Sequence, residues 1–152
     1  MTVIQLAPVL GDLALARPAT ARLVTLRPRI GRTSIAWLTA IMRAHGRDTW
    51  AEAAELVLAR IAADPTDPVN ARSFVRRDVP RRRGFITGWD HRAGCAIRFH
   101  PDTTLCLRLP VEIAAHLRTM TGLEATPAAA AVLAAAPRID PSARRYLPEA
   151  LS

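Results

Sequence analysis

The sequence predicts an α+β protein in which an N-terminal αα-hairpin packs with a three-stranded antiparallel meander and C-terminal helices. Between residues 34 and 64, apolar residues recur every three or four positions, as on the buried face of a helix. Between residues 85 and 109 they alternate with polar residues, as in half-buried strands. A proline then opens a further helical stretch. A chain of 152 residues is long enough for one core, so we expect a single domain.

Composition is that of a globular protein. Half of the residues are hydrophobic, although the chain contains 12 prolines and 29 alanines. No apolar run reaches the roughly 18 residues that a membrane-spanning helix needs, so we expect no membrane association. Two cysteines are too few for a disulfide framework, and the N-terminal stretch lacks the basic start of a secretory signal. We therefore expect a cytoplasmic protein.

The positive charge comes entirely from arginine. The chain has 21 arginines, no lysine and 13 acidic residues, a net charge of +8. Absence of lysine is typical of a GC-rich coding sequence and favours a bacterial or phage origin. Selection against lysine, the acceptor of ubiquitin-like and acetyl groups, is the alternative explanation. In either case every cation is a planar guanidinium that can bind phosphate or carboxylate through two hydrogen bonds.

Charge is arranged in blocks along the chain. Residues 1–47 carry seven arginines and one aspartate, residues 48–70 one arginine and five carboxylates, and residues 71–109 nine arginines and three aspartates. The blocks have net charges of +6, −4 and +6, and the remainder is neutral. Within the single domain, residues 1–152, we distinguish an irregular basic N-terminal arm (1–33), a helical hairpin (34–64), an Arg-rich connector (71–84), the meander (85–109), C-terminal helices (110–137) and a tail (138–152).

The N-terminal half predicts two helices after an extended arm. Prolines within the first 30 residues disfavour helix there. From Ser34 the apolar spacing indicates a helix that stops at Gly46. Thr49 and Glu52 then form a capping-box pattern, which opens a second helix that ends before Pro65. Its apolar face is expected to contain Trp50, Ala53, Ala54, Val57, Leu58 and Ile61.

Three segments have strand character, at residues 85–89, 95–100 and 104–109. The third places its leucines on one side and Thr104, Cys106 and Arg108 on the other. A three-residue loop before it keeps the apolar residues of the second and third strands on one face. This register predicts His100 opposite Thr104 and Arg98 opposite Cys106. By the same parity, the buried face of the first strand is expected to hold Phe85, Thr87 and Trp89.

The C-terminal third predicts two helices and an anchored tail. Pro110 opens a helix that ends at Gly122, and residues 127–136 form a short, almost wholly apolar helix bounded by Pro127 and Pro137. Such a helix is usually buried or covered by a partner. The polar tail offers Tyr146 and Leu147 as anchors.

Residues 104–136 resemble the ribbon-helix-helix repressors, in which a strand of alternating residues precedes two helices and the paired strands of a dimer read the major groove. The resemblance implies that Thr104, Cys106 and Arg108 form the reading face. The chain departs from the family in its alanine-rich second helix, which lacks a polar start. It also has an upstream strand placed to occupy the edge that a dimer would use.

Other motifs give less support to a function. The pair of helices suggests a DNA-binding helix-turn-helix, but Glu52 and Glu55 at the start of the second helix would repel phosphates. The sequence also contains no catalytic serine or zinc-protease motif and no glycine-rich phosphate loop. Asp90, His91 and Cys95 are weak catalytic candidates, so the residues do not identify an enzyme and we expect no cofactor.

A metal site is not expected either. His91, Cys95, His100 and Cys106 lie within sixteen residues. The predicted register, however, places Cys95 on the face opposite His100 and Cys106, which argues against a zinc site and against a Cys95–Cys106 disulfide.

The arginines define the candidate binding site. We predict a protein that binds nucleic acid, or a nucleoprotein complex, mainly through arginine–phosphate contacts. The alternative is a structural or interaction subunit of a phage, mobile-element or defence assembly that docks an acidic or apolar protein surface. A third interpretation pairs the arginines with the protein's own Glu52, Glu55, Asp64 and Asp67. A homo-oligomer is compatible with all three. The predicted site residues are Arg72, Arg76, Arg77, Arg81, Arg82, Arg83, Arg98, His100 and Arg108.

Overall fold

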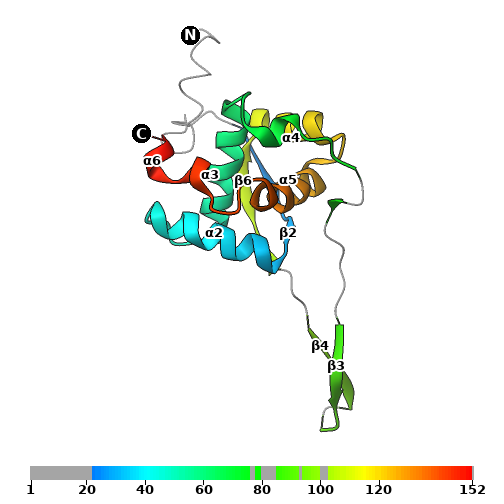
Figure 1. Cartoon of the computed structure of the whole chain (residues 1–152). Coiled ribbons are helices and arrows are strands. Elements are labelled where there is room, and N and C mark those ends of the chain that lie inside the picture. Colours follow the sequence, from blue (N-terminus) through cyan, green and yellow to red (C-terminus); the bar gives the residue numbers. More distant parts are fainter. Residues whose placement is uncertain (1–21, 76–77, 80–84, 93, 100–102, 152) are drawn as a thin grey trace.

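The computed structural model describes residues 22–75, 78–79, 85–92, 94–99 and 103–151 and has the predicted α+β class. Helices pack against one face of a short antiparallel ribbon, and a β-hairpin stands away from this body (Figure 1). The helices are α2 (Arg32–Ala44), α3 (Trp50–Ala63), α4 (Val111–Thr121), α5 (Ala125–Ile139) and the short α6 (Pro148–Leu151), with the 3-10 turns η2 (Pro68–Ala71) and η4 (Arg144–Tyr146). The strands are β1 (Leu23–Leu26), β2 (Arg29–Ile30), β3 (Phe85–Asp90), β4 (Cys95–Phe99), β5 (Thr103–Thr104) and β6 (Leu107–Pro110).

The predicted helical pair is confirmed as α2 and α3. Gly46 follows α2 with φ of +63°, a conformation that glycine adopts at little cost. The Thr49 hydroxyl accepts a hydrogen bond from the Glu52 amide at 3.1 Å and caps α3 as predicted. The Glu52 carboxylate binds the amide of Asp48 at 3.2 Å, one residue earlier than the capping box predicts.

The prediction of a buried α3 face is wrong for one residue. Trp50 is exposed, because it occupies the first position of the helix and its indole N–H donates to the Thr39 hydroxyl at 2.9 Å. The remaining members of that face are buried as predicted: Ala53, Ala54, Val57, Leu58 and Ile61.

A continuous antiparallel ribbon joins the N-terminal arm to the third predicted strand. β1 pairs with β6, and β2 pairs with β5, in the same register. The Leu105 amide donates to the Pro28 carbonyl at 3.0 Å and bridges the two ladders, while the Val111 amide extends the pairing to Arg22. Residues 22–30 and 103–111 therefore form one two-stranded ribbon.

The predicted three-stranded meander is not confirmed. β3 and β4 pair with each other, with Phe85 opposite Phe99 and Ile86 opposite Arg98. β5 and β6 pair instead with β2 and β1 of the N-terminal arm. The predicted pairing of Arg98 with Cys106 is therefore wrong. A register shift between Ile86 and Gly88 also breaks the simple alternation expected in the first strand. The predicted pair His100–Thr104 involves a residue outside the described range.

The other edge of β6 is covered by a helix. Glu55 of α3 accepts a hydrogen bond from the backbone amide of Arg108 at 2.8 Å through its carboxylate. An antiparallel neighbour on this edge would need the same amide. This contact gives a physical reason why β6 lies beside α3 rather than beside β4.

Helix α5 lies at the centre of the body, in contact with α2, α3, α4, β1 and β2 (Figure 1). Of the two alternatives expected for this helix, burial or cover by a partner, the structure shows burial, since Ala128–Leu133 and Ala135–Pro137 are all buried. Alanines allow the surrounding elements to approach α5 closely. The larger side chains of the core come from those neighbours, among them Leu38, Ile41, Leu58, Leu107, Leu109, Ile113 and Leu117.

The predicted bounds of this helix are wrong, because α5 continues through Pro137 to Ile139. Proline lacks the amide that would bind the carbonyl of Leu133 in the preceding turn. The Ser34 hydroxyl donates to this carbonyl at 2.9 Å, inside the core. A side chain from α2 therefore supplies the hydrogen bond that Pro137 cannot make.

Tyr146 anchors the C-terminal tail as predicted, with 1% of its surface exposed. Its phenol donates to the buried carboxylate of Asp67 at 2.8 Å, and its ring lies edge-on to Trp37. Burial, and then the hydrogen bond to Asp67, raise the pKa of Tyr146 well above its ordinary value, so the phenol stays a donor. The Trp37 indole donates to the Asp140 carbonyl at 2.8 Å, and the His45 imidazole donates to the Tyr146 carbonyl at 2.6 Å.

We expect His116 of α4 to make the stability of the protein depend on pH. The Asn70 amide nitrogen donates to the carbonyls of Ile61 and Asp64, so its oxygen faces His116 Nε2 at 2.8 Å and requires the Nε2–H tautomer. Burial lowers the pKa of His116 below its ordinary 6.5. The unfolded chain therefore binds the proton more readily, and the stabilisation present above pH 6.5 is lost as the pH falls below that value.

We expect His116→Gln, which keeps a donor for Asn70 but cannot titrate, to lose less stability than the wild type between about pH 7.5 and about pH 5.5. Urea unfolding followed by circular dichroism at both pH values measures this difference. Parallel losses of stability in the two proteins would contradict the assignment to His116.

Candidate nucleic-acid interface

The ribbon has one buried and one exposed face. Val24, Leu26, Pro28 and Ile30 alternate with exposed or half-exposed residues on one strand, and the three leucines of the other strand are buried as predicted. Thr25 lies opposite Arg108 and Arg29 opposite Thr104, and the shared register places Arg27 opposite Cys106. The outer face of the ribbon thus consists of Thr25, Arg27, Arg29, Thr104, Cys106 and Arg108.

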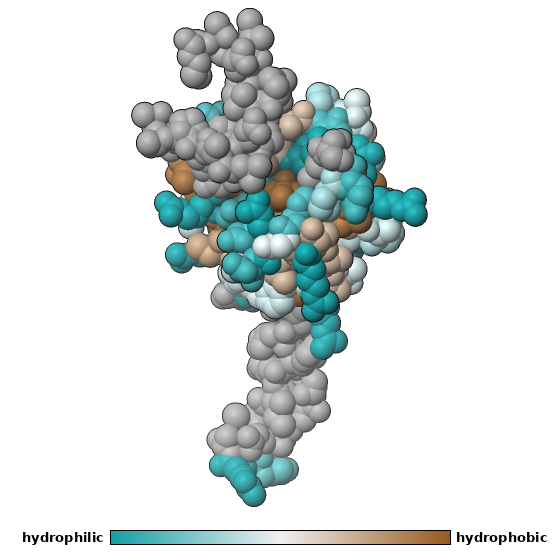
Figure 2. Space-filling view, turned by 90° about the vertical axis from the view of Figure 1, so that its left-hand side faces the viewer, coloured by the Kyte–Doolittle hydropathy of each residue, from teal (hydrophilic) through white to brown (hydrophobic). Residues whose placement is uncertain are grey.

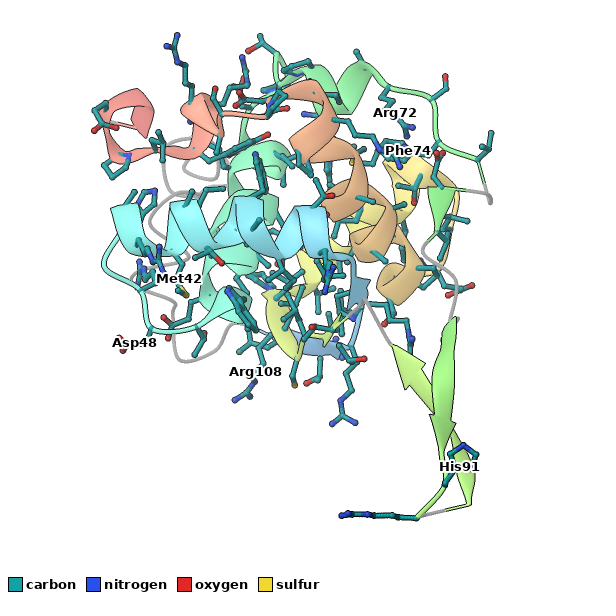
Figure 3. All side chains as sticks on the ribbon, turned by 60° about the horizontal axis from the view of Figure 1, so that its bottom comes forward. Met42, Asp48, Arg72, Phe74, His91 and Arg108 are labelled. Carbon is teal, nitrogen blue, oxygen red and sulfur yellow. The ribbon has the colours of Figure 1, made fainter. Side chains whose placement is uncertain are left out.

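Three arginines, Arg27, Arg29 and Arg108, lie on this outer face, and we call them the ribbon arginines. Arg27 and Arg108 are exposed and Arg29 is half-exposed. Figure 3 shows the Arg108 side chain pointing away from the body. Arg27 and Arg29 are two residues apart on one strand, so their Cα atoms are separated by about 7 Å. Exposed Arg22 and Arg32 flank the ribbon at its two ends.

Arg72, a predicted site residue, is engaged within the protein. Its guanidinium donates to the Asp78 carboxylate at 3.0 Å and lies 4.7 Å from the centre of the Phe74 ring (Figure 3). The second carboxylate oxygen of Asp78 accepts the Val75 amide at 2.8 Å. Arg72 therefore holds the chain after η2 in a turn, which gives it a structural role.

Of the remaining predicted site residues, two lie within the described part of the chain and six lie outside it. Arg108 lies on the ribbon, and Arg98 is part of β4 at a position opposite Ile86. The others lie outside the described residues: Arg76, Arg77, Arg81, Arg82, Arg83 and His100.

The carboxylates of residues 48–70, the acidic block, make contacts within the described part of the chain. Arg145 lies 3.4 Å from the Asp64 carboxylate and 3.6 Å from that of Asp67. Hydrogen bonds from the hydroxyl and amide of Thr66 hold the pKa of Asp64 below its ordinary value. Glu55 binds the Arg108 amide and Glu52 the Asp48 amide. These carboxylates hold the tail, the ribbon edge and the α3 cap in place.

Hairpin β3–β4 projects away from the body of helices (Figures 1 and 3). Its turn contains the exposed residues His91, Arg92 and Gly94, with Gly94 at φ of +66°. Figure 3 places His91 at the far end of the projection. Within the described ranges, neither strand pairs with a strand of the body.

Sequence reasoning missed Arg27 and Arg29 as site residues. Residues 23–30, LVTLRPRI, do alternate between buried and outward-facing positions, which is a strand signal. The neighbouring prolines favoured an irregular arm instead. Pro28 is compatible with the ribbon because only its carbonyl is needed for the bridge to Leu105.

The ribbon-helix-helix resemblance implies one strand followed by two helices, and the chain has this order in β6, α4 and α5. The exposure expected for Thr104, Cys106 and Arg108 is also confirmed. The strand that occupies the edge of β6 is β1, however, and not the segment at 95–100. The chain therefore completes within itself a ribbon that these repressors build from two subunits.

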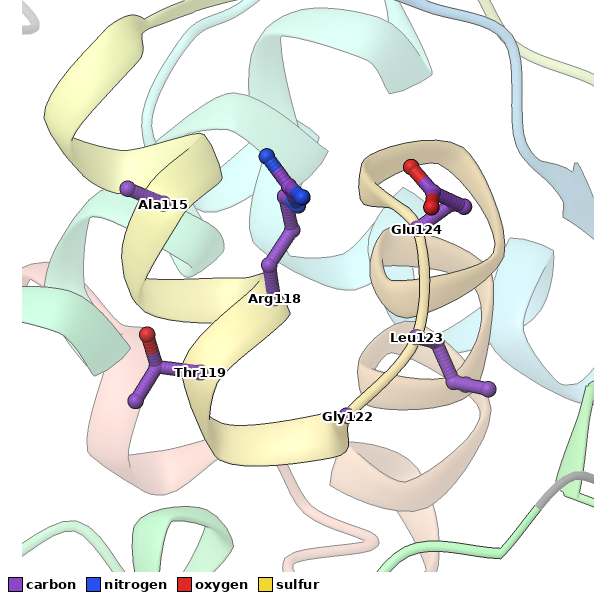
Figure 4. Close-up of a pocket in the computed structure, with 6 residues that line it drawn as sticks. All are labelled: Ala115, Arg118, Thr119, Gly122, Leu123 and Glu124. Carbon is purple, nitrogen blue, oxygen red and sulfur yellow. The ribbon is translucent and has the colours of Figure 1, made fainter.

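A hollow of about 370 Å³ lies between the end of α4 and the start of α5 (Figure 4). It is lined by Ala115, Arg118, Thr119, Gly122, Leu123 and Glu124. Small-molecule sites are typically enclosed and mostly apolar, whereas this hollow is open and carries both an arginine and a glutamate. It lacks the features of a ligand site.

Within the described part of the chain, no group of three or more metal-ligating side chains comes together, and Cys106 is a free thiol. Among these residues no helix combines the length and apolar character needed to cross a membrane. Comparison of the chain with models of protein families, with curated proteins and with solved structures yields no match.

Proposed function

We propose that this protein binds nucleic acid through contacts between the ribbon arginines and backbone phosphates. The single observation that carries the proposal is the outer face of the ribbon, where Arg27, Arg29 and Arg108 gather from segments about 80 residues apart in the sequence. Guanidinium groups bind phosphate oxygens through two hydrogen bonds, and Arg27 and Arg108 are exposed on this face.

The other residues of this face fit phosphate binding as well. Thr25 and Thr104 are exposed, and hydroxyls are common donors to phosphate oxygens. Aromatic side chains, on which single-stranded bases stack, are missing from the outer face as defined by its six residues. Contact with the sugar–phosphate backbone is therefore the form of binding that this surface supports best.

Salt dependence tests the proposal. Binding of the wild type to a fluorescent duplex of about 30 base pairs is measured by anisotropy between about 50 and 200 mM salt. We expect affinity to fall steeply with salt. The triple variant Arg27→Ala, Arg29→Ala, Arg108→Ala should bind more weakly and reduce the slope of log affinity against log salt by about 2.7, since each phosphate contact contributes about 0.9.

The matched control removes three exposed arginines from other elements, Arg43, Arg118 and Arg138. Both triple variants lose the same net charge, so a general charge effect would weaken them equally. Equal slopes for the two variants would contradict a specific role of the ribbon, and a wild type that fails to bind at low salt would refute the proposed function.

A further inference from the structure

The dimensions of hairpin β3–β4 match a groove of duplex nucleic acid. A strand of six residues is about 20 Å long, and two paired strands lie about 4.8 Å apart. The major groove of B-form DNA is about 12 Å wide and admits a two-stranded ribbon. The register shift between Ile86 and Gly88 adds twist, which helps a ribbon follow a helical groove.

The described hairpin carries a small positive charge. Residues 85–92 and 94–99 include two arginines, Arg92 and Arg98, and one aspartate, Asp90. Arg92 is exposed in the turn, and Figure 2 shows hydrophilic residues at the far end of the projection. A β-hairpin with no further layer is marginally stable in water, so a ligand that covers it would also stabilise it.

The hairpin is also close to the ribbon arginines along the chain. β5 begins four residues after β4 ends, so Phe99 and Thr103 are at most about 14 Å apart. Thr104 pairs with Arg29. A duplex whose backbone contacts the outer face of the ribbon would therefore have one of its grooves within reach of the hairpin.

We propose that hairpin β3–β4 is an arm that enters the major groove of double-stranded DNA, with Arg92 at its tip contacting base edges or the phosphates that line the groove. This inference rests on the proposed function and specifies its ligand as a duplex. The ribbon arginines hold the backbone outside the groove, and the arm reaches into it.

Groove-specific footprinting tests the arm. Dimethyl sulfate methylates guanine N7, which lies in the major groove. In complexes with a duplex, we expect the wild type to protect guanines from methylation. Arg92→Glu should lose this protection and bind about tenfold more weakly. Arg138→Glu, the same charge reversal at an exposed position on α5, serves as the matched control. Thermal unfolding of both variants checks that the body is intact.

The outcomes separate the two proposals. If the wild type binds duplex DNA but guanine N7 stays reactive and Arg92→Glu behaves like Arg138→Glu, the arm is refuted and the proposed function stands. If the wild type binds only single strands or RNA, the arm is again refuted. If it binds no nucleic acid, both proposals fail. Should light scattering show a dimer that Arg92→Glu converts to a monomer, the hairpin is an interface between two copies instead.

Discussion

Replacing Asp67 with alanine is expected to lower the free energy of unfolding by about 3–5 kcal/mol, the largest effect that we predict for a single substitution. The Asp67 carboxylate is almost fully buried and accepts hydrogen bonds from the Tyr146 phenol and the Val69 amide at 2.8 and 3.0 Å. Arg145 Nε lies 3.6 Å from it in an ion pair and makes no hydrogen bond among the described residues. Alanine would leave the phenol and the Val69 amide without an acceptor and would remove the carboxylate beside Arg145 Nε.

Urea unfolding measures this loss, and Tyr146→Phe tests the same contact from the other side. Phenylalanine keeps the ring packed near Trp37 but removes the donor, so we expect a loss of about 1.5–3 kcal/mol. Asp48→Ala, at an exposed position, is the control and should change stability by less than about 0.5 kcal/mol. If Asp67→Ala were as mild as this control, the tail would not depend on the buried carboxylate.

Replacing Ser34 with alanine should destabilise the protein by about 1–3 kcal/mol, because the Leu133 carbonyl would be left without a donor in the core. The residue at 137 decides the size of this effect. An alanine there supplies the amide that proline lacks, and a regular helical hydrogen bond to Leu133 becomes available. In the Pro137→Ala background, Ser34→Ala should therefore cost less than it does in the wild type.

A double-mutant cycle by urea unfolding gives the coupling between these two positions directly. We expect a coupling free energy of about 1 kcal/mol, such that the double variant loses less stability than the sum of the losses of the two single variants. Thr33→Ala, at the exposed neighbouring position of α2, is the matched control and should show no coupling to position 137. Additive effects of Ser34→Ala and Pro137→Ala would mean that the hydroxyl does not replace the missing amide.

Local signals predicted most of the helices correctly. The Thr49 cap and the glycine stops at Gly46 and Gly122 act over a few residues and are visible in the sequence. The end of α5 was predicted wrongly for a tertiary reason. Proline normally stops a helix, but α5 continues because a hydroxyl 99 residues earlier in the chain satisfies the carbonyl that Pro137 leaves unpaired.

The strand pairing was not predictable from alternation alone. The leucines of β6 correctly indicated which face is buried, but any alternating strand could have been their partner. The partner is β1, about 80 residues away, and Glu55 binds the amide on the other edge. For the same reason Arg108 was identified as exposed while its neighbours Arg27 and Arg29 were missed. When a site is formed by two strands that are far apart in the sequence, its residues can be predicted only if the pairing register of those strands is known.

The most direct test of the account uses Cys106, the free thiol that lies opposite Arg27 on the outer face of the ribbon. The rate at which a maleimide alkylates Cys106 is followed by peptide mass spectrometry, with and without a saturating DNA duplex at low salt. Nucleic acid held by the ribbon arginines should slow alkylation of Cys106 severalfold, and high salt or the triple variant should restore the rate of the unbound protein. An unchanged rate in a saturated complex would show that nucleic acid does not cover the ribbon and would contradict the account.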